Sequence, residues 1–395
     1  MNWLDSIISK EDKIVIGLMS GTSMDGIDSA IVHIRGNGLD TTVELIDFMT
    51  YPYTNRLRYD LEEITNASIS KISDLNFAVG EAFSDAAISI IERAGFKPVE
   101  VDLIGTHGQT VFHNPPSHQS EYSSTLQIGE PDIITERTGI TTVSDFRPRD
   151  MSSDGEGAPL VPYVDYILFK NKDKTRIAQN IGGISNCTIV TPDLTDVIAF
   201  DSGPGNILLD EIMRIHSSGK RNYDKNGEIA KKGEVDYKVL YNLLNNNYFK
   251  VPPPKTTGRE MFGKNESQRL YKLVENKSLD LSNLLATLVQ FTVDTIYNSY
   301  EDYVFSKWKI SEVILSGGGA FNPLMVNKLA QKLKPIELSL SYKYNIPADS
   351  KEAISIAVMA NETIFGNPSN LPNVTGARSA SPLGKISIGK NILGK

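Results

Sequence analysis

The sequence predicts two α/β domains of related design, and three observations support this prediction. The chain has 395 residues, which is roughly twice the size of an ordinary single domain. A strand, a glycine-rich turn and a second strand occur near the N-terminus and again from residue 176. Each of these hairpins is followed by segments with helical spacing of apolar residues. We expect one domain at residues 1–140 together with 350–395, and the other at residues 141–349.

In the first half, Lys13 to Arg35 contains an apolar run, a turn rich in glycine and hydroxyl residues, and a second apolar run. This order predicts a β-hairpin, with a third strand at Thr42 to Met49. Apolar residues recur at helical spacing from Ile72 to Ala94, and a glycine then ends the helix. Asp102 to Gly105 resembles the end of a buried strand, with Thr106 to Thr110 at its tip.

The second half repeats the design. A hairpin is predicted from Arg176 to Val190, and the apolar stretch Val197 to Phe200 leads into a turn at Asp201 to Asn206. The further elements that the pattern predicts are helices at 207–215, 281–300, 322–333 and 351–365 and a strand at 312–315.

Composition and charge exclude several classes of protein. The net charge of -8 argues against nucleic acid as the main partner, because phosphate recognition needs a basic face. The single cysteine, Cys187, excludes an internal disulfide framework and fits a reducing compartment. No stretch reaches the roughly 18 apolar residues of a membrane span, and the N-terminus lacks the apolar run of a signal peptide. We therefore expect a cytoplasmic protein with no membrane partner.

The turn of the first hairpin, Gly21 to Asp28, has the composition of a phosphate-binding loop. Its glycines let backbone N–H groups approach phosphate oxygens, and its side chains include the hydroxyls of Thr22 and Ser23. The carboxylates of Asp25 and Asp28 are of the kind that Mg²⁺ prefers. An ordinary β-turn rich in small residues is the alternative interpretation.

Two common phosphate motifs are missing from the sequence. There is no Gly-x4-Gly-Lys-Ser/Thr run, which excludes a P-loop, and no Gly-x-Gly-x-x-Gly opens a helix after the first strand. Gly317 to Gly319 follows a strand and precedes a helix. It can accept a flat ring or a phosphate at the helix N-terminus, although glycine runs also simply turn the chain.

Four polar residues are candidates for chemistry. Asp201 follows an apolar run, and a carboxylate at the carboxyl end of a buried strand lies where α/β sites form. Its functional interpretation is a general base, and the alternative is a turn-forming or capping aspartate. His107 is either a site residue or a hydrogen-bonded histidine at a strand end. Arg147 and Asp150 lie in a charged cluster that suits a sugar's polar groups or, alternatively, surface ion pairing.

Short motifs run in order along most of the chain: GLMSGTSMDGID at 17–28, GTHGQT at 105–110, QIGEP at 127–131, SDFR with RD at 144–150, GAPLVP at 157–162, QNIGGI at 179–184, FDSGPGN at 200–206, PPKTTGRE at 253–260, GGGA with NP at 317–323, and KEA at 351–353. Together they resemble the anhydro-N-acetylmuramic acid kinase family. The resemblance implies a two-domain actin/hexokinase-like (ribonuclease H-like) fold, an active site with ATP in the cleft between the domains, and a homodimer.

The family resemblance also implies a reaction and its cofactors. A 1,6-anhydro sugar would be cleaved and phosphorylated with ATP and Mg²⁺, giving N-acetylmuramic acid 6-phosphate for cell-wall recycling. Asp201 would deprotonate the attacking water, and Glu352 would help to position it. On the sugar side, the resemblance implies His107, Gln109, Arg147 and Asp150. For ATP, it implies Gly21, Thr22, Ser23, Met24, Asp25, Gly26, Ile27, Asp28, Gly182, Gly183, Gly203, Gly205, Gly317, Gly318, Gly319 and Asn322. For the metal, it leaves Asp25 and Asp28.

Departures from the family pattern leave alternatives open. Ser152 to Glu156 replaces a stretch of smaller residues and adds two acidic groups near the expected sugar site. This motivates a related kinase for another anhydro sugar, such as levoglucosan. Met19 stands where the wider kinase superfamily carries an aspartate, and Ser202 replaces a threonine. A nucleotide-gated binding protein of the actin or chaperone type is an alternative of another class. A nicotinamide-dependent dehydrogenase is a weaker one.

Overall fold

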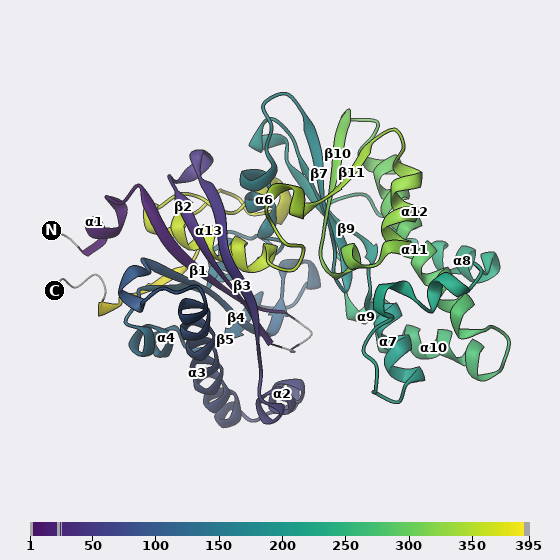
Figure 1. Ribbon diagram of the computed structural model, residues 1–395, viewed down its shortest axis with the longest axis horizontal. Helices are drawn as coiled ribbons and strands as arrows, with labels where there is room; N and C mark the ends of the chain where they lie inside the picture. Colours follow the sequence, from purple (N-terminus) through teal and green to yellow (C-terminus); the bar gives the residue numbers. More distant parts are fainter. Residues whose placement is uncertain (1–2, 22–23, 25, 391–395) are drawn as a thin grey trace. The chain divides into compact units, whose positions relative to one another are not determined.

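The computed structural model describes residues 3–21, 24 and 26–390. The chain divides into two compact units, one formed by Met1–Leu168 with Ser350–Lys395 and the other by Phe169–Asp349 (Figure 1). Each unit is built on one mixed β-sheet with helices packed against it. Within the described ranges, no helix combines the length and the apolar character that crossing a membrane requires.

The chain passes from the first unit to the second after Leu168 and returns to the first at Ser350. Residues 142–144 form strand β6 (Thr142–Ser144), which pairs with β4 (Leu103–Asn114) in the sheet of the first unit. A strand of only three residues gives too weak a pattern to be assigned to one sheet from sequence alone.

The sheet of the first unit has the strand order β12-β6-β4-β1-β2-β3, and β5 pairs with β4. Strands β1, β2 and β3 are antiparallel neighbours, whereas β4 runs parallel to both β1 and β6. The remaining strands are β1 (Asp12–Ser20), β2 (Gly26–Arg35), β3 (Thr42–Pro52), β5 (Ser124–Ile128) and β12 (Lys385–Ser387).

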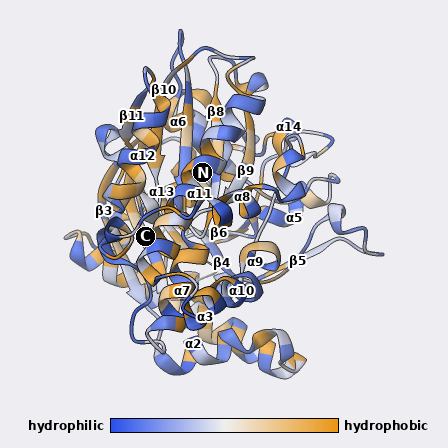
Figure 2. Ribbon diagram, turned by 90° about the vertical axis from the view of Figure 1, so that its right-hand side faces the viewer, coloured by the Kyte–Doolittle hydropathy of each residue, from blue (hydrophilic) through white to orange (hydrophobic). Residues whose placement is uncertain are grey.

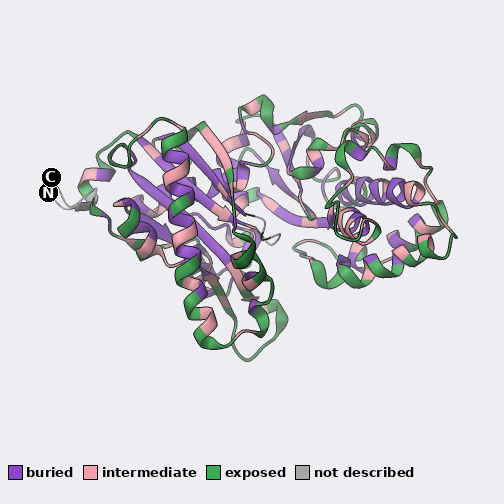
Figure 3. Cartoon of the chain, turned by 60° about the horizontal axis from the view of Figure 1, so that its bottom comes forward, coloured by how far each residue is buried: buried purple, intermediate pink, exposed green. Residues whose placement is uncertain are grey.

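Helices α3 and α13 pack on the two faces of this sheet. Apolar residues of α3 form one core with side chains such as Ile16 and Leu18 of β1. The residue between them, Gly17, faces α13 instead, because neighbouring strand residues point to opposite faces. At Gly105 of β4, a Cβ would lie 2.6 Å from the carbonyl oxygen of Ile356, so α13 can lie this close only over glycine. Buried residues, purple in Figure 3, accordingly run along these strands.

The helices of the first unit are α1 (Trp3–Ile8), α2 (Asn55–Glu62), α3 (Ile69–Arg93), α4 (Pro131–Thr138), α5 (Phe146–Met151), α6 (Val161–Phe169), α13 (Lys351–Phe365) and α14 (Pro372–Thr375), with short 3-10 turns η1 (Gly38–Asp40), η2 (Ile64–Asn66), η3 (Pro98–Glu100) and η4 (Pro116–His118). The predicted helices at 72–94 and 351–365 are confirmed. The side chain of Ser68 caps α3 by accepting from the N–H of Lys71, which explains why this helix begins earlier than predicted.

The sheet of the second unit has the order β11-β10-β7-β8-β9. Here too the first strand is central, with two antiparallel strands on one side and parallel strands on the other. The strands are β7 (Thr175–Ile181), β8 (Ile184–Val190), β9 (Ile198–Pro204), β10 (Ile310–Ser316) and β11 (Glu337–Leu340). The shared pattern β1-β2-β3-β4-β6 and β7-β8-β9-β10-β11 confirms the predicted α/β class with two related halves.

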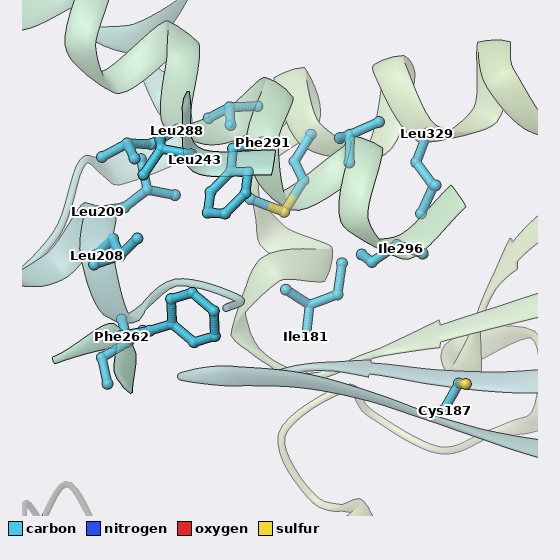
Figure 4. Packing of buried hydrophobic residues seen from close by; sticks show 14 of the residues in the cluster. Ile181, Cys187, Leu208, Leu209, Leu243, Phe262, Leu288, Phe291, Ile296 and Leu329 are labelled. Atoms are coloured by element: carbon cyan, nitrogen blue, oxygen red, sulfur yellow. The ribbon is translucent and has the colours of Figure 1, made fainter. Parts of the chain in front are cut away.

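The core of the second unit lies between this sheet and its helices. Ile181 of the sheet, Leu208 of α7 and Phe291 of α11 point into the same packed space (Figure 4). Hydrophilic and hydrophobic residues share the same helices in Figure 2, as expected for helices that cover a core on one side. The helices are α7 (Ile207–His216), α8 (Tyr237–Leu244), α9 (Arg259–Phe262), α10 (Lys264–Glu275), α11 (Leu281–Tyr303) and α12 (Pro323–Leu333), with η5 (Leu194–Asp196), η6 (Lys225–Gly227), η7 (Ala230–Lys232), η8 (Asn247–Lys250), η9 (Gly318–Phe321) and η10 (Ser341–Tyr344).

Two local predictions were wrong. Residues 201–204 were expected in a turn, but β9 continues to Pro204 because β8 pairs with it as far as that residue. Thr106 to Thr110 was expected at the tip of a strand that ends at Gly105, but β4 continues to Asn114. The physical reason is β5, which pairs antiparallel with residues 109–114 and extends the hydrogen-bond ladder. His107 therefore lies inside a strand.

Candidate active site

The β1–β2 hairpin is anchored at its base by two polar side chains. Ser20 Oγ lies 2.9 Å from the carbonyl oxygen of Gly26 and 2.7 Å from Oε1 of Gln109. Gln109 is fully buried, and its Nε2 donates to the carbonyl oxygen of Gly21 at 3.3 Å. Met24 has a φ of 53° and donates its N–H to the same carbonyl oxygen. Ser20 thus links the two sides of the hairpin, and Gln109 fixes Ser20 and Gly21 on one of them.

The other predicted positions of this loop differ in what they can offer a ligand. Ile27 is fully buried in the hydrophobic core, so its side chain is directed away from solvent. Asp28 Oδ1 accepts a hydrogen bond of 2.6 Å from Thr50 Oγ1. Thr22, Ser23 and Asp25 lie outside the described residues. Within the described part of the chain, no group of three or more His, Cys, Asp or Glu residues is arranged to hold a metal ion.

The side chains of His107 and Arg147 are joined by a hydrogen bond in which Arg147 is the donor. The Nδ1 of His107 lies 3.0 Å from the carbonyl oxygen of Gly108, which can only accept, so Nδ1 carries the proton. Nε2 then accepts from Nε of Arg147 at 2.9 Å. Burial, and next the charge of Arg147, lower the pKa of His107 to about 3, so the ring stays neutral near pH 7. A second bond, from Arg147 to the carbonyl oxygen of Gly157 at 2.7 Å, fixes the guanidinium plane.

Glu352 lies in the first turn of α13 and interacts electrostatically with Arg147. Burial raises the pKa of Glu352, while Lys351 and Arg147 act in the opposite direction. Burial lowers the pKa of Arg147 to about 10, and the charge of Glu352 opposes this shift. Lys351 in turn forms a buried ion pair of 2.8 Å with Asp165 of α6, which anchors the start of α13. The structure therefore brings the predicted residues Arg147 and Glu352 together in the first unit.

Asp150 is completely buried and has several protein partners. Its Oδ2 accepts from the N–H of Gly157 at 2.8 Å. Its Oδ1 accepts from Nδ2 of Asn370 and from Oγ1 of Thr375, both at 2.7 Å. The carboxylate of this predicted sugar residue thus ties the loop after α5 to the segment around α14.

The two additional acidic groups of the Ser152–Glu156 segment are also engaged by the protein. Glu156 accepts from the N–H and the hydroxyl of Ser117, at 3.1 and 2.6 Å. Asp154 forms an exposed ion pair of 2.8 Å with Arg378. Both carboxylates are held by residues of the first unit.

A pocket of about 380 Å³ lies in the first unit beside the His107 strand. Such a volume falls in the range of small-molecule sites. Residues of three of the motifs contribute to its wall. Its lining residues include Asn76, Thr106, His107, Gly108, Glu130 and Asp145. Asn76 and Glu130 are fixed by a hydrogen bond of 3.0 Å between their side chains. The pocket offers hydroxyl, amide and carboxylate groups close to neutral His107.

In the second unit, Asp201 lies on β9 and is held from three directions. Its Oδ2 accepts a hydrogen bond of 2.9 Å from the N–H of Thr257. Its own N–H donates to the carbonyl oxygen of Lys255 at 3.0 Å. Its carbonyl oxygen accepts from the hydroxyl of Tyr248 at 2.7 Å. The backbone and one carboxylate oxygen are therefore fixed in position.

The electrostatic environment of Asp201 suits proton transfer near neutral pH. Burial raises its pKa to about 7, and the charge of Glu260 acts in the same direction. The Thr257 N–H and the Lys255 ammonium oppose the shift. A general base is most effective when its pKa lies near the working pH.

The predicted glycines of the second unit meet around the start of α7. The N–H groups of Gly205 and Ile207 donate to the carbonyl oxygen of Gly183, and Asn206 donates to that of Gly182, at 2.8–3.1 Å. This network joins the β7–β8 turn to the N-terminus of α7. Gly203 has a φ of 145°, in the region that favours glycine.

The glycine loop after β10 packs on the same turn. Gly317 has a φ of 81°, and a Cβ there would lie 2.7 Å from the carbonyl oxygen of Ile181. Gly318 and Gly319 begin η9. Asn322 caps α12, since its Oδ1 accepts from the N–H groups of the first turn at 3.1 and 3.3 Å. The structure thus brings Gly182, Gly183 and Gly317–Gly319 together within the second unit.

A pocket of about 330 Å³ opens beside this loop. Gly318 and Asn322 line it, and so do the rings of Tyr223 and Phe321, which are 59% and 58% exposed. Asp210, in the first turn of α7, also lines the pocket, and burial raises the pKa of its carboxyl to about 7. Two exposed rings near a partly buried carboxyl group and a glycine loop offer the contacts that a nucleoside needs.

Sequence reasoning missed residues that the structure places next to Asp201 and in the pocket beside Gly318. Lys255 and Thr257 belong to the quoted PPKTTGRE motif, but the motif gave no role for them. Asp210 interrupts an apolar run at the start of a helix, which is a signal that could have been used. Tyr248 lies in an irregular segment whose contacts only the fold reveals.

Comparisons with known proteins identify the family. The family model described as anhydro-N-acetylmuramic acid kinase matches residues 13–389. The anhydro-N-acetylmuramic acid kinase of Caldanaerobacter subterraneus subsp. tengcongensis is 44% identical over 396 residues, covering 98% of this chain and 100% of the relative. That of Bacillus cereus is 42% identical over 380 residues, covering 94% and 98%.

Among solved structures, the ADPNP-bound activator of 2-hydroxyisocaproyl-CoA dehydratase from Clostridium difficile has a TM-score of 0.45 at 12% identity, covering 89% of this chain and 96% of that one. The family match spans both units and includes every motif quoted above. The chain belongs to the anhydro-N-acetylmuramic acid kinase family.

Proposed function

We propose that this protein uses ATP to open 1,6-anhydro-N-acetylmuramic acid by hydrolysis and to phosphorylate O6, giving N-acetylmuramic acid 6-phosphate. The observation that carries the proposal is Asp201, whose carboxylate is fixed through one oxygen and has a pKa of about 7. Such a group can accept a proton from water at neutral pH. The family to which the chain belongs supports the choice of substrate.

The proposed reaction couples two displacements, one at C1 of the sugar and one at the γ-phosphorus. Water attacks C1 on the face opposite to the bridging oxygen, as in an inverting glycosidase, and its proton passes to Asp201. The C1–O6 bond breaks as O6 bonds to the γ-phosphorus, and the bond from the γ-phosphorus to the β,γ-bridging oxygen breaks. The leaving sugar oxygen is thereby captured by phosphorus, and no separate general acid is required.

On the nucleotide side, we place the nucleoside of ATP in the pocket beside Gly318. The aromatic rings of Tyr223 and Phe321 suit the base. Asp210 lies about one helical turn from the N-terminus of α7, which suits ribose hydroxyls if the phosphates lie at that N-terminus. The phosphates would contact backbone N–H groups of the glycine turns.

The first hairpin supplies the remaining phosphate contacts in this proposal. Gly21 to Asp28 would face the phosphates, with Gln109 and Ser20 as its supports. Asp25 or Asp28 would hold Mg²⁺, which, when bound, would neutralise charge developing on the transferred phosphoryl group. Asp28 carries a carboxylate of the kind that such a site needs, already oriented by Thr50.

On the sugar side, we propose that the pocket beside His107 receives the sugar. Arg147 would donate to the sugar, His107 would hold the guanidinium in position through its Nε2, and Glu352 would help to position the water. Asp150 would act as an internal support of this wall, because its oxygens already accept from Gly157, Asn370 and Thr375.

The defining experiment supplies anhydro-N-acetylmuramic acid, ATP and magnesium in water enriched in heavy oxygen. Mass spectrometry of the product should find the label at C1 of a 6-phosphorylated sugar. Label in inorganic phosphate with the anhydro sugar unchanged would refute the proposal. Levoglucosan under the same conditions serves as the comparison substrate, and we expect slower turnover with it because it lacks the amide and lactyl groups.

We also propose a homodimer in the cytoplasm, where ATP is available. Support for the dimer comes from the family resemblance. Light scattering coupled to size-exclusion chromatography tests it: a mass of about one chain at the concentrations used for kinetics would contradict it.

A further inference from the structure

A buried lysine lies next to the strand that carries Asp201. Lys255 is 6% exposed, and its Nζ lies 4.9 Å from the ring centroid of Tyr248 and 5.0 Å from that of Tyr303. Among the described residues, no carboxylate lies within ion-pair distance of this ammonium. An ammonium over aromatic faces is attracted by the ring quadrupole, most strongly where it is shielded from water.

The two rings come from different elements, and one of them connects the ammonium to Asp201. Tyr248 lies in η8, and its hydroxyl donates to the carbonyl oxygen of Asp201 at 2.7 Å. Burial raises the pKa of Tyr248, so this hydroxyl keeps its proton. Tyr303 ends α11, and its hydroxyl donates to the carbonyl oxygen of Phe249 at 3.2 Å. Lys255 therefore joins η8, α11 and its own segment at one point.

The backbone of the lysine segment borders β9 directly. The carbonyl oxygen of Lys255 accepts from the N–H of Asp201 at 3.0 Å, and two residues later Thr257 donates to Oδ2 of Asp201 at 2.9 Å. A shift of this segment would therefore move the donor that orients the carboxylate.

We propose that Lys255 is a positioning residue for Asp201: its ammonium, held between Tyr248 and Tyr303, keeps residues 255–257 against β9 and so keeps the Thr257 N–H on the Asp201 carboxylate. This inference rests on the proposed role of Asp201 as the base. Lys255 acts through Asp201 and the two rings.

The charge of Lys255 also acts on the pKa of Asp201, and this effect can be measured separately from kcat. The groups that act on the pKa of Asp201 are the Thr257 N–H and Lys255, which lower it, and Glu260 of α9, which raises it. Burial lowers the pKa of Lys255, while Asp302 of α11, Cys187 and Asp201 favour its charged form. Removing the ammonium should therefore move the acidic limb of the pH–rate profile to higher pH.

The experiment compares Lys255→Met with Lys272→Met. Lys272 is an exposed lysine in the last turn of α10, so its replacement makes the same change in net charge away from Tyr248 and Tyr303. For Lys255→Met we expect kcat to fall about tenfold or more and the acidic limb of the pH–rate profile to move to higher pH. The Kd for ATP should change by less than about twofold. Lys272→Met should match the wild type in kcat, in the position of the limb and in the Kd for ATP. Tyr248→Phe keeps the ring and should lower kcat without moving the limb.

Two further variants keep the test decisive. Lys255→Arg retains the charge, so its acidic limb should stay within about 0.3 pH unit of the wild type even if kcat falls; this also covers the case in which Lys255→Met fails to fold. The inference would be overturned if Lys255→Met had the same kcat and the same acidic limb as the wild type. It would also be overturned if the acidic limb moved as far in Lys255→Arg as in Lys255→Met. Asp201→Asn separates the two levels: an active Asp201→Asn refutes the base itself, whereas an inactive one with an unaltered Lys255→Met refutes only the positioning role.

Discussion

The backbone N–H of Thr257 donates a hydrogen bond of 2.9 Å to Oδ2 of Asp201. Within residues 3–21, 24 and 26–390, Oδ1 of the same carboxylate has no hydrogen-bond donor. One oxygen thus orients the group while the other is available to a water molecule. This division of roles is what a general base requires, since the carboxylate must be oriented without losing its capacity to accept a proton.

Asp201→Asn should abolish most of the turnover and leave the site's structure intact. The amide oxygen of asparagine can still accept from Thr257, but the side chain can no longer take a proton. We expect kcat to fall by about 10²–10⁴-fold, as for loss of a general base, and the Kd for ATP, measured by calorimetry, to stay the same. Near-normal kcat would remove Asp201 from this role.

The rate should depend on pH through the ionisation of Asp201. Since its pKa is about 7 and the deprotonated form is the active one, kcat should rise as the pH increases through neutrality. Glu260 raises this pKa, so Glu260→Gln should move the acidic limb to lower pH, by less than about one unit. Steady-state rates with saturating substrates measure the limb. A movement in the opposite direction would show that another group controls it.

The fold was predictable because its signals are local and repeated. Each half contains a hairpin whose apolar runs and glycine turn are continuous in the sequence, and β1–β2 and β7–β8 form as expected. Gly17 belongs to one of the sequence motifs, but the sequence does not show why a glycine is needed at that position. It lets α13, more than 300 residues away along the chain, approach β1, and no local pattern reports such a contact.

The position of a candidate residue was predictable where it depends on the local pattern alone. Asp201 was expected directly after the apolar run of a strand, and it lies on that strand, β9. Asp150 shows why other roles could not be read in this way, because its partners Asn370 and Thr375 lie 220 and 225 residues away. Lys255 was likewise hidden, since its environment is created by rings from η8 and α11.

Asp150→Asn should reduce stability and leave the affinity for the sugar unchanged. Asparagine replaces one acceptor oxygen with a donor, so at least one of the groups bound to Asp150 faces another donor in a buried place. We expect a loss of about 2–4 kcal/mol in the free energy of unfolding, measured in urea. The control is Asp154→Asn in the same loop, whose exposed ion pair with Arg378 should contribute nothing measurable. A raised KM for the sugar with unchanged stability would instead favour direct contact with the sugar.

Asp210 should make nucleotide affinity depend on pH. If its carboxylate accepts from the ribose hydroxyls, ATP binds the deprotonated form better and lowers its pKa, which is about 7 in the free protein. Affinity should then fall as the pH drops below neutrality, and binding near pH 7 should release protons. Calorimetry in buffers of different ionisation enthalpy measures this release directly.

Asp210→Asn should weaken ATP binding by about tenfold at a pH of about 8 and remove the proton release. The matched control is the ligand: 2′,3′-dideoxy-ATP lacks both hydroxyls, so the wild type should bind it about tenfold more weakly than ATP, while Asp210→Asn should bind the two nearly equally. Because this comparison cancels any general loosening of the pocket, it isolates the contact between carboxylate and ribose. Equal discrimination by both proteins would place the ribose elsewhere and leave Asp210 as a support of α7.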